Sequence, residues 1–175
     1  MTLISQTGAM TKQFTVSGYV LDETRERLLL VSHKKLGKWL PPGGHVDQNE
    51  TPQAAVVREV FEETGIVARL VPHLGMHLDL DGIGADQLDT PVSMSYQLIP
   101  ERPDEPAHIH MDMAFILIEE ASTRRSIDAE LQEVNAAGWF SLLEIERLDA
   151  FASVKAHARA FLDPSASGID APLAR

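Results

Sequence analysis

The feature that most constrains this chain is the segment from Gly44 to Ile66, in which a short loop leads into an acidic amphipathic stretch. Thr51 is a favourable helix N-cap, and Pro52 fits the first helical position, where a missing N–H costs nothing. Gly65 stands where a left-handed C-terminal cap is needed. These signals predict a helix from Thr51 to Thr64.

Three carboxylates gather on one side of this helix. On a helical wheel of about 100° per residue, Glu59, Glu62 and Glu63 fall within one arc of roughly 100°. The apolar residues on the opposite side are predicted to form the buried stripe: Ala54, Val57, Val60 and Phe61. Like charges at neighbouring helical positions are destabilising unless cations lie among them. Because Mg²⁺ takes oxygen ligands and shares its coordination with substrate phosphates, the cluster suits a metal-bridged diphosphate.

The net charge of −11 narrows the partners that the chain can bind. A polyanion binder normally presents a basic patch, so we expect no nucleic-acid polymer as partner. The same charge repels a phosphorylated substrate unless divalent cations or local Arg and Lys side chains intervene. The absence of cysteine excludes disulfide scaffolds, thiolate zinc sites and cysteine nucleophiles.

The length of 175 residues suits one domain, which we place at residues 13–162. Residues 1–12 lack a clear period and are predicted to be a flexible N-terminus. Residues 163–175 are rich in Pro, Ser, Ala and Gly and are predicted to be a disordered C-terminal tail. We see neither a signal peptide nor an apolar run long enough to cross a bilayer, and we therefore expect a cytoplasmic protein without a membrane partner.

Between the termini, strand signals alternate with helix signals. Strands are predicted at residues 14–21, 27–33, 66–71, 92–99 and 109–119, and a further short strand is predicted to end at Trp139 and Phe140. Further helices are predicted at residues 141–147 and 150–162, and loops at residues 34–44 and 75–90. Strands with interspersed helices indicate an α/β fold in which helices cover a mixed sheet.

The segment from Gly44 to Ile66 matches the Nudix box at every defining position, so the chain resembles the Nudix hydrolase family. The positions that carry the match are Gly44, Glu50, Arg58, Glu59, Glu62, Glu63 and Gly65, with aliphatic Val60 and Ile66. The resemblance implies an α/β/α sandwich with the box as loop, helix and loop. It also implies a pyrophosphohydrolase in which metal-activated water attacks phosphorus in a P–O–P linkage, within a nucleoside di- or triphosphate derivative or a similar small molecule.

The resemblance also assigns roles to the residues of the box. Glu59, Glu62 and Glu63 are implied as ligands of a divalent metal, with the backbone carbonyl of Gly44 as an extra ligand. Mg²⁺ is the expected ion, and Mn²⁺ is the alternative. Arg58 is implied to pair with a box carboxylate and to orient it.

The general base of the implied reaction is open among three carboxylates. Glu59 lies in the box, Glu119 ends an apolar strand, and Glu133 precedes Trp139 by six residues. We rank Glu59 first and Glu133 next. For Glu119 and Glu133 the alternative interpretation is surface charge.

Four other residues are candidates for substrate binding. His108, His110 and Asp112 alternate along one predicted strand and therefore face the same way. They could line the substrate pocket beside the box helix, or they could form an exposed polar strand face. Lys38 lies just before the Pro-Gly-Gly loop and could offset phosphate charge, with a solvated basic loop as the alternative.

Two other functions are compatible with this fold. A non-catalytic nucleotide-binding sensor would be expected to lose box carboxylates, and all of them are present. An isoprenyl-diphosphate isomerase would need a cysteine near the site, and the chain has none. Dimers are common in the family, so the resemblance allows a homodimer, although no sequence signal points to one.

Overall fold

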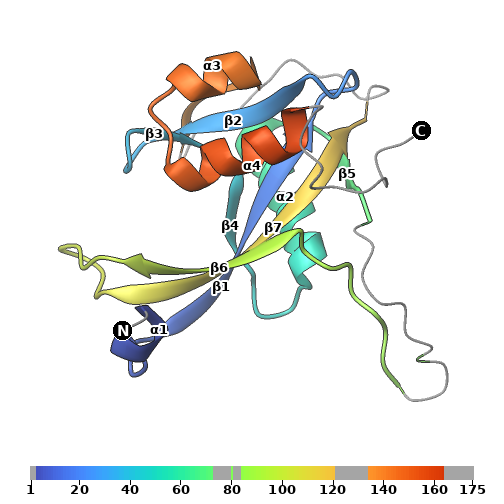
Figure 1. The fold of residues 1–175 in the computed structure, drawn as a ribbon. Coiled ribbons are helices and arrows are strands. Elements are labelled where there is room, and N and C mark those ends of the chain that lie inside the picture. The colour runs from blue at the N-terminus through green and yellow to red at the C-terminus, as the bar shows by residue number, and fades with distance from the viewer. Residues whose placement is uncertain (1–2, 73–79, 81–83, 121–133, 164–175) are drawn as a thin grey trace.

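The computed structural model describes residues 3–72, 80, 84–120 and 134–163, which form one mixed sheet with helices on both sides (Figure 1). The strands are β1 (Lys12–Leu21), β2 (Arg27–His33), β3 (Lys38–Leu40), β4 (Gly43–His45), β5 (Ala68–Leu70), β6 (Ser93–Ile99), β7 (His108–Glu119) and β8 (Val134–Ser141). The helices are α1 (Leu3–Gln6), α2 (Pro52–Thr64), α3 (Leu142–Arg147) and α4 (Ala152–Leu162). The predicted α/β class is confirmed.

Two long parallel strands, β1 and β7, form the spine of the sheet. They pair in continuous register from Lys12 opposite Ile109 to Leu21 opposite Ile118. β2 pairs antiparallel with β1 near its start, with β3 near its end and with β8 along its whole length. β4 pairs with the first half of β1, whereas β6 and β5 pair with successive parts of β7. The sheet is therefore mixed, as the alternation of strand and helix signals indicates.

Each face of the sheet has its own hydrophobic core, because side chains alternate along a strand. On one face, Val56 and Val60 of α2 pack on Val16 and Val20 of β1. A Cβ added to Gly18, which lies between those two strand valines, would meet Val60 at 2.7 Å. The glycine therefore lets α2 lie directly on the strand.

The other face is covered by α3 and α4 (Figure 1). Ile145 of α3 and Val154 of α4 pack with Tyr19 and Leu21 of β1, and all four side chains are buried. With α2 on the opposite face, the three layers form the α/β/α sandwich that the resemblance implies. In the described part of the chain, no helix has the length and apolar character needed to cross a membrane.

The buried face of α2 differs from the predicted one. The stripe predicted from the helical wheel is Ala54, Val57, Val60 and Phe61. The residues that the helix buries are Ala55, Val56, Val60 and Thr64. Phe61 is 45% exposed, and the side chains of Glu59 and Glu63 lie toward the backbone of β4 instead. The prediction is wrong except at Val60, because a wheel that weighs hydrophobicity cannot register the space that two glycines in β4 leave for carboxylates.

Two further differences concern short or irregular strands. The predicted loop at residues 34–44 contains β3 and β4, which are only three residues each and show no alternation. β8 begins at Val134 and ends at Ser141, so it is longer than the sequence indicates. Within the predicted flexible N-terminus, α1 spans Leu3–Gln6. Within the predicted loop at residues 75–90, residues 75–79 and 81–83 lie outside the described residues, as does all of the tail after residue 163.

Candidate active site

The acidic cluster is carried by α2, which is fixed at both ends by the predicted caps. The Thr51 hydroxyl accepts a hydrogen bond from the Ala54 N–H at 3.3 Å. Gly65 adopts a φ of 70°, which favours glycine, and its N–H donates to the Phe61 carbonyl at 2.7 Å. The predicted helix and both of its caps are thereby confirmed.

Two of the box glutamates lie against the glycine backbone of β4. The Gly43 N–H donates to Glu63 Oε2 at 2.9 Å. A Cβ added to Gly44 would lie 2.6 Å from the carboxyl carbon of Glu59, a separation that real Cβ atoms essentially never show. Because Gly43 also pairs with Ser17 of β1, β4 holds both carboxylates at the sheet. Glycine at position 44 thus provides the space that the Glu59 carboxylate occupies.

Arg58 donates five hydrogen bonds, four to carboxylates of the acidic cluster and one to a backbone carbonyl. Its Nε and Nη2 donate to the two carboxylate oxygens of Glu50 at 3.1 and 2.6 Å, and Nη2 also donates to the His45 carbonyl at 3.1 Å. Nη1 donates to Glu59 at 2.8 Å and to Glu62 at 3.0 Å. These bonds, that to Glu50 first, hold the pKa of Arg58 above its ordinary value. The guanidinium therefore fixes the positions of three carboxylates.

Glu50 joins the loop before α2 to the helix itself. Its Oε1 accepts a hydrogen bond from the Asp47 N–H at 2.9 Å in addition to the bond from Arg58. The Arg58 bond is the main cause that lowers the pKa of Glu50 below its ordinary value. The side chain of Glu59 is only 15% exposed, whereas that of Glu62 is 57% exposed, so the cluster opens to solvent on the Glu62 side.

The cluster has the donor chemistry that a hard divalent cation requires. Carboxylate oxygens of Glu59, Glu62 and Glu63 and the carbonyl oxygen of Gly44 are the kind of ligand that Mg²⁺ prefers. As the side chains stand, no three His, Asp or Glu residues of the described ranges converge closely enough to hold a metal ion, and Arg58 is the cation that bridges Glu59 and Glu62. The exposed Glu62 side chain can turn toward an ion without disturbing the core. The cradle at Gly44 and the all-oxygen donor set therefore fit Mg²⁺.

Two of the three candidate bases fall in the described residues. Glu59 is bonded to Arg58 in the cluster. Glu119 ends β7 opposite Ala68 of β5 and is 7% exposed, so its interpretation as surface charge is wrong. Its position in the alternation of β7 matches that of Leu117, which packs in the core beneath α2. Glu133 lies outside the described residues.

His108, His110 and Asp112 share one face of β7, as predicted, but this face is opposite to the one that α2 covers. Asp112 pairs with Thr15 of β1, and the next residue of β1, Val16, is the one that packs beneath α2. These side chains therefore face away from α2 itself, and substrate binding by them stays a prediction. Alternation shows which residues share a face of a strand, but it does not show which helix that face meets.

His110 is in contact with His45, the residue that follows Gly44. The two rings meet edge to face with their centroids 5.1 Å apart. His108 is buried, and it places Nδ1 2.9 Å from the Pro106 carbonyl and Nε2 3.0 Å from Nε2 of His110. Burial first, and then the neighbouring His45 and His108, lower the pKa of His110 to about 4. These histidines therefore do not form an exposed polar strand face, which was the alternative to pocket lining.

Asp112 belongs to a polar cluster that sequence reasoning missed. Its carboxylate accepts hydrogen bonds from the Thr15 hydroxyl at 3.1 Å and the Ser17 hydroxyl at 3.0 Å. Burial raises the pKa of Asp112 above its ordinary value, while these hydrogen bonds act in the opposite direction. On the same face of β1, the Tyr19 hydroxyl lies 3.1 Å from Nδ1 of His157 in α4. Since three distant segments supply these side chains, no local pattern could have grouped them.

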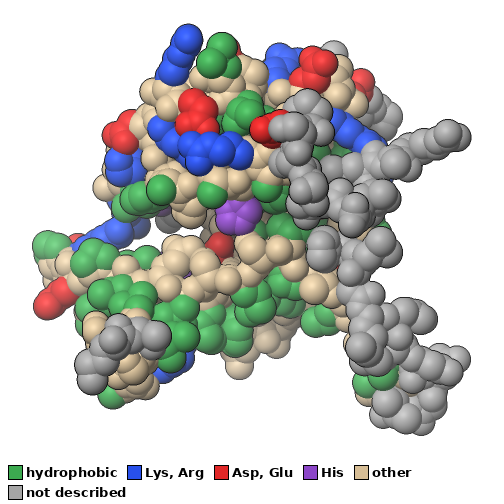
Figure 2. All heavy atoms as spheres, in the orientation of Figure 1, with side chains coloured by type: hydrophobic (Ala, Val, Ile, Leu, Met, Phe, Trp, Pro, Cys, Tyr) green, Lys and Arg blue, Asp and Glu red, His purple; other side chains and the backbone are tan. Residues whose placement is uncertain are grey.

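The polar cluster lies where α4 approaches β6. Nε2 of His157 is 2.7 Å from the Ser93 hydroxyl of β6, and the His157 ring stacks on Tyr19 with centroids 4.6 Å apart. Figure 2 shows the surface hollowed between the helices in its upper half and the strand layer below, with a histidine and an acidic side chain at the base of the hollow. Such a hollow offers hydrogen-bonding groups to a polar ligand.

Lys38 forms an ion pair with Asp149 in the segment between α3 and α4. Its ammonium group also lies 5.5 Å from the centroid of the Phe151 ring. A backbone hydrogen bond joins the same two segments, because the Trp39 N–H donates to the Asp149 carbonyl at 3.0 Å. In this conformation the carboxylate of Asp149 offsets the positive charge of Lys38 that was predicted to bind a substrate phosphate.

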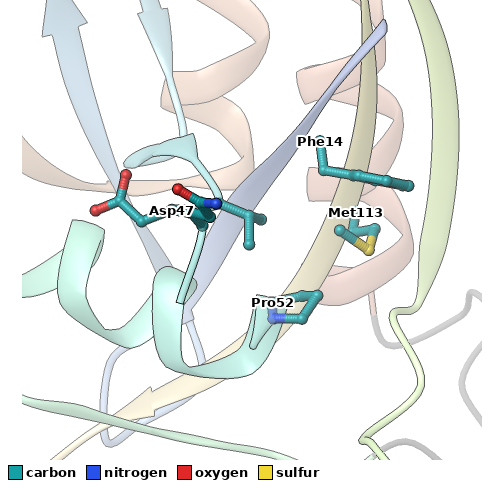
Figure 3. A pocket seen from close by; sticks show the side chains of 6 residues that line it. Phe14, Asp47, Pro52 and Met113 are labelled. Atoms are coloured by element: carbon teal, nitrogen blue, oxygen red, sulfur yellow. The ribbon is translucent and has the colours of Figure 1, made fainter. Parts of the chain in front are cut away.

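A cavity of about 390 Å³ opens near the N-terminal end of α2 (Figure 3). Its lining is Phe14, Val46, Asp47, Gln48, Pro52 and Met113. Phe14 and Met113 come from the neighbouring strands β1 and β7 and lie on one side, with Pro52 of α2 below them. The lining is mostly apolar, so this cavity differs in chemistry from the acidic cluster.

Comparisons with known proteins connect this geometry to a family. The model of the NUDIX domain matches residues 11–161. A Lactococcus lactis protein named "Probable DHNTP pyrophosphohydrolase" is 29% identical over 134 residues, which are 77% of this chain and 65% of that protein. A Bacillus subtilis protein named "Putative 8-oxo-dGTP diphosphatase" is 43% identical over 58 residues, which are 33% of this chain and 38% of that protein. The matched stretches thus span less than two thirds of these curated relatives.

Solved structures show the same architecture. The crystal structure of a hydrolase of the NUDIX family from Clostridium perfringens is 27% identical and superposes with a TM-score of 0.68, covering 86% of this chain and 96% of that one. The dihydroneopterin triphosphate pyrophosphohydrolase of E. coli is 15% identical, with a TM-score of 0.55 over 87% of this chain and 97% of that one. At that level of identity, the second likeness concerns the fold alone.

Proposed function

The chain belongs to the Nudix family, and from this premise we propose that it is a Mg²⁺-dependent pyrophosphohydrolase that cuts a P–O–P linkage in a nucleoside di- or triphosphate derivative or a similar small molecule. The observation that carries the proposal is the contact between Glu59 and the glycine backbone of β4. A partly buried carboxylate held there, beside two further glutamates and one arginine, is a suitable place for cations that bind phosphates.

In the proposed reaction, Glu59, Glu62, Glu63 and the Gly44 carbonyl would hold the divalent ion, for which Mn²⁺ is the alternative to Mg²⁺. When bound, the ion would neutralise charge on the phosphate oxygens and make a water molecule more acidic. Arg58 keeps the carboxylates in place through its bonds to Glu59 and Glu62. Its role is to position these groups.

Hydrolysis joins the water oxygen to one phosphorus, breaks the bond from that phosphorus to the bridging oxygen, and releases a proton. Glu59 is our first candidate for the base that accepts this proton, followed by Glu133. Glu119 is the third candidate, because it is buried on the face of the sheet that also carries α2.

The groups that we propose for substrate binding lie on the face of β7 opposite to the one that α2 covers. Asp112, with its two hydroxyl partners, is our main candidate for a substrate-binding group, because it lies in the polar cluster near α4 and β6. His110 and His108 extend this line of polar side chains toward His45 and the box. Lys38 would have to leave Asp149 before it could bind a phosphate.

A phosphate-release screen over nucleotides and their derivatives, with and without Mg²⁺, tests the proposal. We expect hydrolysis only with the metal, and we expect Glu59→Gln and Glu63→Gln each to lower turnover by at least about 10²-fold. Glu101→Gln, at an exposed position outside the cluster, is the matched control and should behave like the wild type. Circular dichroism verifies that each variant folds. Near-normal activity in both box variants would overturn the proposal, and inertness toward every diphosphate with tight binding of one would indicate a sensor.

A further inference from the structure

Two histidines at the start of β7 lie close to each other and to a glutamate just before the strand. His108 and His110 point to the same face of β7, and their Nε2 atoms are 3.0 Å apart. Glu105 lies in the connection between β6 and β7, with its Oε1 3.5 Å from Nε2 of His108. These three residues, which we call the histidine site, bring two imidazoles and one carboxylate together within six consecutive residues.

The ring of His108 is oriented by a backbone carbonyl. Its Nδ1 lies 2.9 Å from the carbonyl oxygen of Pro106. Because a carbonyl can only accept, the proton of the neutral ring is on Nδ1, and Nε2 carries the lone pair. Nε2 of His110 is then the donor of the 3.0 Å bond between the two rings. Histidines that bind metals are oriented in the same way, with the second ring nitrogen bonded to a carbonyl or carboxylate.

The charge state of His110 also suits a metal ligand, which must be a neutral imidazole. Burial, followed by the neighbouring His45 and His108, lowers the pKa of His110 to about 4, so the ring is neutral at pH 7. The negative charge of Glu105 opposes this shift, and it acts on His110 more strongly than the positive charge of Arg102 does. The carboxylate therefore favours positive charge beside this ring.

The spacing of the possible ligand atoms is close to that around tetrahedral zinc. Zn²⁺ binds imidazole nitrogen and carboxylate oxygen at about 2.0–2.2 Å, so two ligand atoms of a tetrahedral site are roughly 3.3–3.5 Å apart. The structure has 3.0 Å between the two nitrogens and 3.5 Å between Glu105 Oε1 and His108 Nε2. Two of the three distances between protein ligands therefore need to change by no more than about 0.5 Å.

The third distance requires rotation of one side chain. As the side chains stand, no three His, Asp or Glu residues in the described ranges form a complete metal site. The side chain of Glu105 is 44% exposed, so its carboxylate can turn toward His110. The backbone can stay in place, because Arg102 and Glu105 exchange two backbone hydrogen bonds of 2.8 and 3.1 Å. The histidine site is thus one side-chain movement away from three ligands.

We propose that the histidine site binds Zn²⁺ through Nε2 of His108, Nε2 of His110 and the carboxylate of Glu105, with water as the fourth ligand. When the ion binds, the proton of His110 moves from Nε2 to Nδ1, and the ion takes its place between the rings. Nitrogen ligands select zinc and similar transition metals, whereas Mg²⁺ prefers oxygen. The site shares no ligand with the acidic cluster of α2, so this proposal does not rest on the proposed hydrolysis.

The first test is isothermal titration calorimetry with Zn²⁺, in excess Mg²⁺ to occupy the acidic cluster. We expect one Zn²⁺ per chain. His110→Gln should weaken Zn²⁺ binding at least about 10²-fold and Glu105→Gln about 10-fold, because loss of a ligand costs at least as much as loss of a group that orients one. His33→Gln, which removes a histidine from β2, is the matched control and should bind Zn²⁺ like the wild type. Circular dichroism verifies that the variants fold, and the buried His108 is left intact.

The second test locates the ion. In crystals grown with both Mg²⁺ and Zn²⁺, anomalous scattering at the zinc absorption edge should show a peak between His108 and His110. Glu59→Gln, which impairs the proposed Mg²⁺ site, should leave the Zn²⁺ affinity unchanged, so that failure of either proposal can be recognised separately. A zinc peak only at the acidic cluster, equal Zn²⁺ affinities of His110→Gln and the wild type, or loss of Zn²⁺ binding in Glu59→Gln would each overturn the proposal.

Discussion

The contact between Gly44 and Glu59 leads to the most direct test of how the site is built. In Gly44→Ala, the new Cβ would start 2.6 Å from the Glu59 carboxyl carbon and 2.8 Å from its Oε2. Non-bonded carbon atoms rest at about 3.5–4.0 Å, so the carboxylate must move by about 1 Å. The strand cannot move in its place, because Gly44 pairs with Val16 in the sheet.

The expected effects of this displacement differ for activity and stability. A misplacement of about 1 Å in a catalytic constellation costs on the order of 10² in rate, so we expect turnover to fall about 100-fold. The 2.8 Å bond from Arg58 to Glu59 would be lost or weakened, which costs about 2 kcal/mol for a hydrogen bond to a charged group. For a chain of this size, that loss lowers Tm by about 4–8 °C.

The assay is release of phosphate from the most active substrate of the screen, at saturating Mg²⁺, with thermal unfolding in parallel. Gly8→Ala is the control, because a Cβ at Gly8 would meet nothing within 4 Å. Gly43→Ala gives the contrasting result: its Cβ would run into the Val16 carbonyl and lie 3.1 Å from Ser17 Cα, so this variant should lose stability before activity. If Gly44→Ala kept turnover within about threefold of the wild type, the position of Glu59 would not matter to the reaction.

Two further predictions follow from the contacts around α2 and β7. Arg58→Lys keeps the charge but loses the planar five-donor fork, so we expect the urea unfolding free energy to fall by about 1–3 kcal/mol; an unchanged value would show that the network adds no stability. The lowered pKa of His110, about 4 against an ordinary 6.5, means that the unfolded chain binds this proton more readily. Stability should therefore fall as pH drops from about 6.5 toward 4, and His110→Gln should reduce that dependence. In an NMR titration, a His110 imidazole that titrates near pH 6.5 would contradict this prediction.

The parts of the fold that sequence predicted well are those with local signals. The caps at Thr51 and Gly65 locate α2 to within one residue, because each cap is a property of one side chain or one backbone angle. The strands β1, β2 and β7 follow their apolar patterns closely. In contrast, the face that α2 buries depends on Gly43 and Gly44, which lie outside the helix and leave room for Glu59. Helical periodicity holds no information about such a neighbour.

The contrast between local signals and tertiary contacts also separates the acidic cluster from the groups proposed to bind the substrate. The acidic cluster comes from one continuous segment, so its residue types and spacing could be read directly from the sequence. Asp112 meets Thr15 across a parallel pair whose members are about 97 positions apart, and His157 reaches the same region from α4. The groups proposed to bind the substrate therefore depend on tertiary contacts, whereas those proposed to hold the metal lie on a helix that carries its own signals.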